Sequence, residues 1–175
     1  DTLMYKPDGP LVNTPYSMTV ANGKLYVVQG GRWASQNMRP GHVMIYDGDK
    51  WHNISQQTIQ AATNGNPARD FMDVAVDPMD ANHFFVTSYG NGVYEFRNNQ
   101  VVQQYLPENS SLESAAPNSP KNYTRCTGGT FDAAGNYWVL TSGTTKNVHR
   151  LSRDSNRWNA IDLQYGGSSL VIHTM

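Results

Sequence analysis

A glycine that recurs at a fixed distance after the start of an apolar run is the feature that most constrains how this chain folds. When Leu25, Phe84 and Tyr137 are aligned as the first residues of three such runs, a glycine follows six residues later in each run. These glycines are Gly31, Gly90 and Gly143. The aligned positions are 84 − 25 = 59 and 137 − 84 = 53 residues apart. Repeats of this length, made of strands without a helical period, are typical of propellers and related arrays.

The clearest copy of the repeat spans residues 128–143. One strand ends at Phe131-Asp132, a polar break follows at Ala133–Asn136, and the bulky run Tyr137–Leu140 comes next. Two β-rich runs around a short loop with Gly and Asn predict a hairpin. A single hairpin cannot bury both faces of such strands, so its copies are expected to stack on one another.

Extending each copy to four strands predicts an all-β chain, a β-propeller segment of about three four-stranded antiparallel blades. The expected blades cover about residues 15–54, 71–105 and 127–163, with orphan strands at 2–5 and 169–173. The stretches Ser55–Asp70 and Leu106–Arg125 are expected to be irregular. Closed propellers typically have four to eight blades, so the segment is expected to be a fragment of a larger ring.

The expected orphan strands have a consequence for assembly. Leu3–Tyr5 matches the fourth strand of a preceding blade, and Leu170–Ile172 the first strand of a following one. Three blades cannot close a ring, and strand edges left open invite pairing with another chain. The sequence therefore predicts possible self-association through the terminal blades.

The lengths of the connections predict which end of the segment binds a ligand. In a four-stranded meander, the loops between the second and third strands and the connections between blades lie at the same end. The long segments Gly30–Gly41, Ser55–Asp70 and Leu106–Arg125 all belong to these connections. Long loops on a rigid scaffold commonly carry binding sites. The candidate ligand-binding residues are Arg32, Trp33, Arg39, Arg69, Asp70, Tyr89, Tyr123 and Arg125.

Arg32, Trp33 and Arg39 are the most informative members, because an aromatic ring and guanidinium groups in one loop can stack on a sugar and bind an anionic group. Alternatively, Trp33 fills a blade interface and the arginines pair with nearby acids.

Composition excludes several classes of partner. Charged residues make up 15% of the chain, the formal net charge is −1, and no basic cluster occurs, which argues against nucleic acid and against a polybasic membrane patch. No apolar window approaches the eighteen or so residues of a membrane span, so no membrane insertion is expected. The single cysteine, Cys126, is expected to be a small core residue.

Motifs for catalysis or metal binding are missing from the sequence. Five histidines are scattered without the close spacing typical of metal ligands, and there is no nucleophile elbow or phosphate-binding loop. We therefore predict no metal, no cofactor and no catalytic residues. The alternative is a fragment of a glycan-cleaving enzyme, a hydrolase or lyase, that uses Asp70 or Asp73 near Arg69, since glycoside hydrolysis needs two placed carboxylates.

Several segments resemble one family. The Phe-Asp-x-x-Gly-Asn-x-Trp-Val form at Phe131–Val139 is similar to the two-component-regulator type of β-propeller found in Bacteroidetes. The first seventy residues resemble the PorZ-type propellers of that group, above all in Leu3–Pro10, Gly30–Ser35, Arg39–Gly41 and Met44–Gly48.

This resemblance implies a seven-bladed propeller, or two in tandem, exported to the periplasm or cell surface. Some members are sensor domains of hybrid histidine kinases that detect glycan fragments, and PorZ-type proteins serve the type IX secretion machinery at the outer membrane. The resemblance does not extend to a kinase segment, a transmembrane helix or a carboxy-terminal domain, so it assigns no signalling output to these residues. The predicted function is a non-enzymatic binding or sensor module that takes a glycan or a partner protein on its long-loop face.

Overall fold

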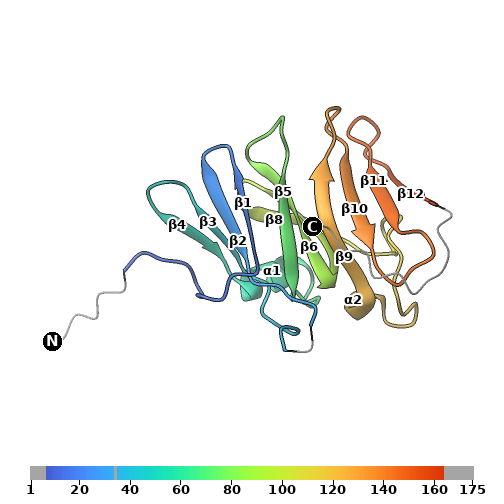
Figure 1. The fold of residues 1–175 in the computed structure, drawn as a ribbon, viewed down its shortest axis with the longest axis horizontal. Helices are drawn as coiled ribbons and strands as arrows, with labels where there is room; N and C mark the ends of the chain where they lie inside the picture. The colour runs from blue at the N-terminus through green and yellow to red at the C-terminus, as the bar shows by residue number, and fades with distance from the viewer. Residues whose placement is uncertain (1–6, 34, 164–175) are drawn as a thin grey trace.

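The chain folds into three four-stranded antiparallel units that follow one another in sequence (Figure 1). The first unit is a sheet of its own, and the second and third join into one eight-stranded sheet. We refer to the three units as the first, second and third sheets. The computed structural model describes residues 7–33 and 35–163. The first sheet contains β1 (Ser17–Ala21), β2 (Lys24–Val28), β3 (Val43–Tyr46) and β4 (Trp51–Ile54). The second contains β5 (Phe71–Val76), β6 (His83–Gly90), β7 (Gly92–Arg97) and β8 (Gln100–Tyr105). The third contains β9 (Thr124–Phe131), β10 (Tyr137–Thr141), β11 (Val148–Leu151) and β12 (Trp158–Ile161). The predicted all-β propeller architecture is confirmed.

Each sheet is a meander in which strands adjacent in sequence pair antiparallel. A short pairing of Tyr89 with Arg125 and of Gly90 with Thr124 joins β6 to β9 and so links the second sheet to the third. The expected orphan strands at 2–5 and 169–173 lie outside the described residues.

Two short helices occur where the sequence predicted irregular structure. Helix α1 (Gln56–Ala62) begins after Ser55, whose side chain accepts a hydrogen bond from the backbone N–H of Thr58, and it buries Ile59 completely. Helix α2 (Pro120–Tyr123) begins at a proline, which suits the first helical position, and β9 follows it directly at Thr124. Local capping and one buried side chain are weak signals, so the sequence pattern did not reveal either helix.

Two apolar layers between the sheets form the core. Successive side chains of a strand point to opposite faces, so Phe84 of β6 packs toward the first sheet and Phe85 toward the third. Phe84 stacks on Phe96 with ring centroids 4.7 Å apart, and Phe85 stacks on Tyr137 at 4.1 Å. Offset-stacked pairs of this kind add about 0.5–1.5 kcal/mol beyond their buried area. The second sheet is therefore buried on both faces and fixes its neighbours.

Long and short connections segregate to opposite ends of the stack. Figure 1 shows the hairpins β1–β2, β3–β4, β9–β10 and β11–β12 turning at the upper end, whereas α1 and α2 lie at the lower end. None of the helices among the described residues has the length and apolar character needed to span a bilayer. The long segments thus gather at one end of the stack, which we call the long-loop face.

The Phe-Asp-x-x-Gly-Asn-x-Trp element has a structural role at the short-turn end. Asp132 Oδ1 accepts hydrogen bonds from the backbone N–H groups of Ala134 and Asn136, and its Oδ2 accepts from Asn136 Nδ2 and from Trp138 Nε1 at 2.8 Å. The side chains of Asn136 and Trp138 are the main reason that the pKa of Asp132 falls to about 2. This carboxylate therefore organises the β9–β10 turn.

Candidate functional site

Six of the eight candidate residues line one pocket of about 500 Å³ on the long-loop face. They are Arg32, Arg69, Asp70, Tyr89, Tyr123 and Arg125. The remaining lining residues are Asn37, Met38, Gly90, Asn91, Ser119 and Asn122. We call this site the arginine pocket. Its lining contains three arginines and one aspartate, so its formal charge is positive.

Arg125 is held against two aromatic rings. Because β9 pairs with the end of β6, Arg125 lies opposite Tyr89, and Tyr123 closes α2 just before β9 begins. The guanidinium carbon lies 5.5 Å from the ring centroid of Tyr89 and 5.5 Å from that of Tyr123. Such cation–π contacts fix the orientation of the guanidinium group without neutralising its charge.

Arg69 is oriented by neutral partners. Its Nη2 donates to Asn122 Oδ1 at 3.0 Å, and its Nη1 lies 3.2 Å from the sulfur of Met38. Within residues 7–33 and 35–163, no carboxylate forms an ion pair with Arg69 or Arg125. Both groups therefore keep their capacity for charge-assisted hydrogen bonds to an anion.

Asp70 ties the loop that carries Arg32 to the start of β5. Its Oδ1 accepts from the backbone N–H of Arg39 at 2.8 Å, and its Oδ2 accepts from that of Met38 at 3.0 Å. Asp70 is buried in a left-handed conformation with φ of 51°. Burial raises the pKa of this carboxyl group, although the two amide hydrogen bonds act in the opposite direction. Both oxygens are thus occupied by the backbone, which gives Asp70 a positioning role.

The other two candidates lie outside the lining. Arg39 contributes its backbone, since its carbonyl also accepts from the Asp70 N–H at 3.0 Å. The Trp33 side chain is 59% exposed, and the guanidinium carbon of Arg32 lies 4.7 Å from its ring centroid. Trp33 therefore does not fill a blade interface, and it connects to the pocket through Arg32.

Sequence reasoning missed the asparagines that organise the pocket. Asn91 Oδ1 accepts from the Arg69 backbone N–H at 3.0 Å, and its Nδ2 donates to the carbonyl of Lys121. Gly90 lets α2 approach, because a Cβ built at Gly90 would lie 2.8 Å from the carbonyl oxygen of Asn122. The run Gly90-Asn91-Gly92 is a signal that could have found Asn91, since glycines on both sides of an asparagine mark a tight connection.

The alternative catalytic residue, Asp73, faces the interface between the second and third sheets. Its carboxylate accepts from the backbone N–H groups of Gly128 and Gly129, each at 2.9 Å. Burial raises the pKa of Asp73. The described residues contain no cluster of His, Cys, Asp and Glu arranged to hold a metal, and Cys126 is buried. Asp73 acts as a cross-sheet acceptor, so the geometry does not favour the enzyme alternative.

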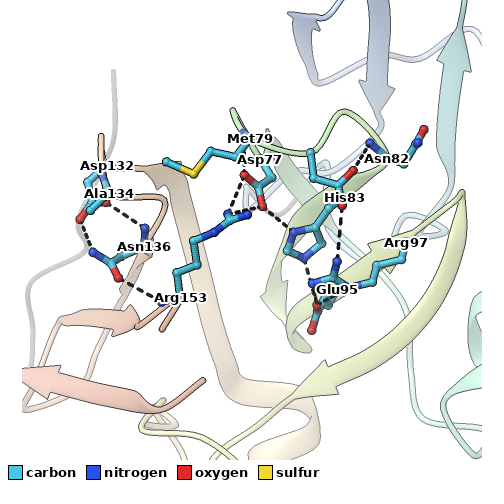
Figure 2. Close-up of polar contacts among 11 residues, drawn as sticks. Asp77, Met79, Asn82, His83, Glu95, Arg97, Asp132, Ala134, Asn136 and Arg153 are labelled. Atoms are coloured by element: carbon cyan, nitrogen blue, oxygen red, sulfur yellow. Dashed lines mark hydrogen bonds and ion pairs between the residues drawn. The ribbon is translucent and has the colours of Figure 1, made fainter. Parts of the chain in front are cut away.

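A smaller pocket of about 280 Å³ lies at the opposite end, over a network of paired charges (Figure 2). His83 Nδ1 lies 2.8 Å from Asp77 Oδ2, and His83 Nε2 lies 2.9 Å from Glu95 Oε1. Arg153 of the third sheet donates to both oxygens of Asp77, and the Tyr105 hydroxyl donates to Glu95 Oε2. These polar groups satisfy one another, so the network clamps the second sheet to the third.

The hydrogen bonds of this clamp decide the state of its carboxyl groups. Burial raises the pKa of Asp77, but hydrogen bonds from His83, Met79 and Arg153 outweigh it and hold that pKa below its ordinary value. The pKa of Glu95 is likewise lowered, because hydrogen bonds from His83 and Tyr105 outweigh the effect of burial. Asp77 and Glu95 therefore act as anions within the clamp.

The fold and the site together define a β-propeller segment with a basic, aromatic pocket on its long-loop face. Neither a family model nor a curated protein matches the chain. Among solved structures, it is similar to PorZ, an essential bacterial surface component of the type-IX secretion system of Porphyromonas gingivalis. The match has a TM-score of 0.83 and 29% sequence identity, and it covers 90% of this chain and 21% of that one. The chain thus spans about a fifth of the length of the PorZ chain.

Proposed function

We propose that this chain is a non-enzymatic binding module of a PorZ-like cell-surface protein, and that the arginine pocket takes a glycan with an acidic substituent. The observation that carries this proposal is the pairing of Arg125 with two tyrosine rings beside Arg69, with no carboxylate of the described chain within ion-pair distance of either arginine. Guanidinium groups bind carboxylate, sulfate or phosphate oxygens, and exposed aromatic rings offer a face for sugar rings.

Localisation at the cell surface or in the periplasm, and a part in type IX secretion, are proposed from the likeness to PorZ, which is a bacterial surface component of that system. A sensor role, as implied by the two-component-regulator resemblance, is a second use of the same binding activity. Both roles need ligand recognition on the long-loop face, so binding is the property to test first.

A glycan array with neutral, uronate-bearing, sulfated and phosphorylated oligosaccharides, followed by isothermal titration of the best ligand, tests the proposal. Arg69→Gln and Arg125→Gln each remove charge-assisted hydrogen bonds of about 1.5–3 kcal/mol, which corresponds to a loss of affinity of about ten- to a hundredfold. Trp33→Ala is expected to weaken binding less, because its ring lies outside the pocket lining.

Arg157→Gln is the matched control, since Arg157 is an exposed arginine in the β11–β12 turn at the opposite end. Equal binding of neutral and acidic glycans, or an equal effect of the control and the pocket variants, contradicts the proposal. Release of reducing sugar that disappears in Asp70→Asn or Asp73→Asn points instead to the enzyme alternative.

A further inference from the structure

A second pocket on the long-loop face has a different chemistry. Its volume is about 630 Å³, and its walls are the segment 107–120 and the loop Gly143–Thr145. Its apolar lining consists of Pro107, Leu112, Ala115, Pro117 and Pro120. We call it the proline pocket. Helix α2 separates it from the arginine pocket, because Pro120 lines the proline pocket whereas Asn122 and Tyr123 line the other.

Hydrogen bonds hold the walls of the proline pocket together. Glu113 Oε2 accepts from the backbone N–H groups of Thr145 at 2.9 Å and Lys146 at 3.0 Å, so it joins one wall to the other. The backbone N–H of Ala115 donates to the carbonyl of Tyr123, which ties the first wall to α2. A pocket whose walls are already fixed loses little conformational freedom when a ligand enters.

The charge of the proline pocket is opposite to that of its neighbour. Glu108 and Glu113 are the ionisable groups among its lining residues, and Glu108 is exposed. Among the residues that the structure describes, no aromatic ring on which a sugar could stack lines this pocket. An anionic amphiphile is disfavoured by the two carboxylates. The complementary ligand has an aliphatic stem that packs on proline and alanine surfaces and a cationic end that reaches the acids.

We propose that the proline pocket is a docking site for a lysine or arginine side chain presented by a partner protein. Both side chains bury a chain of methylene groups while keeping a charged end near solvent, which matches an apolar floor with an acidic rim. The partner lies beside the glycan site across α2, yet its binding does not depend on that site.

NMR titration of the isotope-labelled chain with small probes tests this inference. The probes are N-acetyl-lysine amide, N-acetyl-arginine amide and, as the neutral isostere of lysine, N-acetyl-norleucine amide. We expect saturable shifts of the Ala115 and Thr145 amides with the two cationic probes and weaker binding of the norleucine probe. Because Glu108 is exposed, Glu108→Gln should weaken binding of the cationic probes about two- to fivefold.

Thr145→Lys places a competing cation at an exposed position on the rim and should abolish probe binding without disturbing the fold. Asp154→Asn, which removes an exposed acid of the β11–β12 turn, is the charge-matched control and should change nothing. Equal binding of the norleucine probe, shifts that map away from this pocket, or unchanged affinity in Glu108→Gln overturns the proposal. None of these outcomes bears on acidic glycans at the arginine pocket.

Discussion

Replacement of Gly90 by alanine tests how the repeated glycine connects the fold to the site. Gly90 has φ of +154°, a backbone conformation that side chains rarely adopt, and the alanine Cβ would lie 2.8 Å from the carbonyl oxygen of Asn122. Relief of this contact requires α2 to move away from β6. Since Asn122 orients Arg69 and Tyr123 holds Arg125, the same movement disturbs the arginine pocket.

The expected loss of stability has two parts. Alanine in an unfavourable φ region costs about 1–3 kcal/mol, and the backbone contact adds about 1–3 kcal/mol of overpacking. Together they predict a free energy of unfolding lower by about 2–6 kcal/mol, or a melting temperature lower by about 4–24 °C at this chain length. Urea unfolding followed by tryptophan fluorescence measures the difference.

Gly23→Ala is the matched control. Gly23 also has a positive φ, +73°, but no heavy atom lies within 4 Å of a Cβ built there. The control should therefore cost only the left-handed strain of about 1–2 kcal/mol. If Gly90→Ala destabilises the chain no more than Gly23→Ala, the close approach of α2 does not constrain the fold and the reasoning is refuted.

Three further predictions concern stability and assembly. Because the pKa values of Asp77 and Glu95 are lowered, the stability that these groups contribute is present above their unfolded values of 3.8 and 4.5 and is lost as pH falls through their folded values. Urea unfolding between pH 6 and pH 3 should show that the free energy of unfolding falls less with acid in Glu95→Gln than in the unsubstituted chain. An equal fall in the two chains contradicts this role of the clamp. The Tyr137 hydroxyl is buried without a hydrogen-bond partner in the described chain. Tyr137→Phe should therefore leave the free energy of unfolding, measured with urea, unchanged or raise it by up to about 1 kcal/mol. A decrease in that free energy indicates that the hydroxyl has a partner and contradicts the prediction. Met18 and Val20 are 65% and 76% exposed on the first sheet. Sedimentation should therefore show self-association, and the double variant Met18→Asp, Val20→Asp should abolish it. A monomer at high concentration contradicts this prediction.

Strand periodicity and turn chemistry were enough to predict most of the fold. In the clearest copy of the repeat, β9 ends at Phe131 and β10 begins at Tyr137, as the predicted hairpin requires. Trp51 and Trp158 open β4 and β12, the fourth strands of the first and third sheets. These features are local, so the sequence carries them directly.

The environment of Asp73 could not be predicted from alternation. A register shift between Phe71 and Asp73 interrupts the pairing of β5 with β6. Phe71 faces the first sheet, and Asp73 contacts Gly128 and Gly129 of the third. Strict alternation places residues 71 and 73 on the same face, whereas a bulge reverses the faces beyond it. A bulge has no reliable sequence signal, so the choice between a catalytic and a structural carboxylate needed the structure.

The two asparagines of the arginine pocket illustrate a different limit. Asn91 and Asn122 are 31 residues apart, as 122 − 91 = 31, and both line the arginine pocket because α2 packs against the end of β6. Long-loop segregation predicted that Arg69 and Arg125 share a face, but not which neutral groups orient them. That choice depends on the path of the segment 106–123, which its own side-chain hydrogen bonds determine.

The repeat links packing to recognition within each sheet. In the second and third sheets, the first residue of the aligned run points toward the preceding sheet, and Phe84 and Tyr137 are each only 1% exposed there. The glycine six residues later lies at the long-loop face. There Gly90 lines the arginine pocket, Gly143 lines the proline pocket, and Gly31 immediately precedes Arg32. In the second and third sheets, each run thus begins at a buried residue and ends at a glycine that lines a pocket. The six-residue spacing that lets the sheets stack therefore also places the two proposed binding sites on one face.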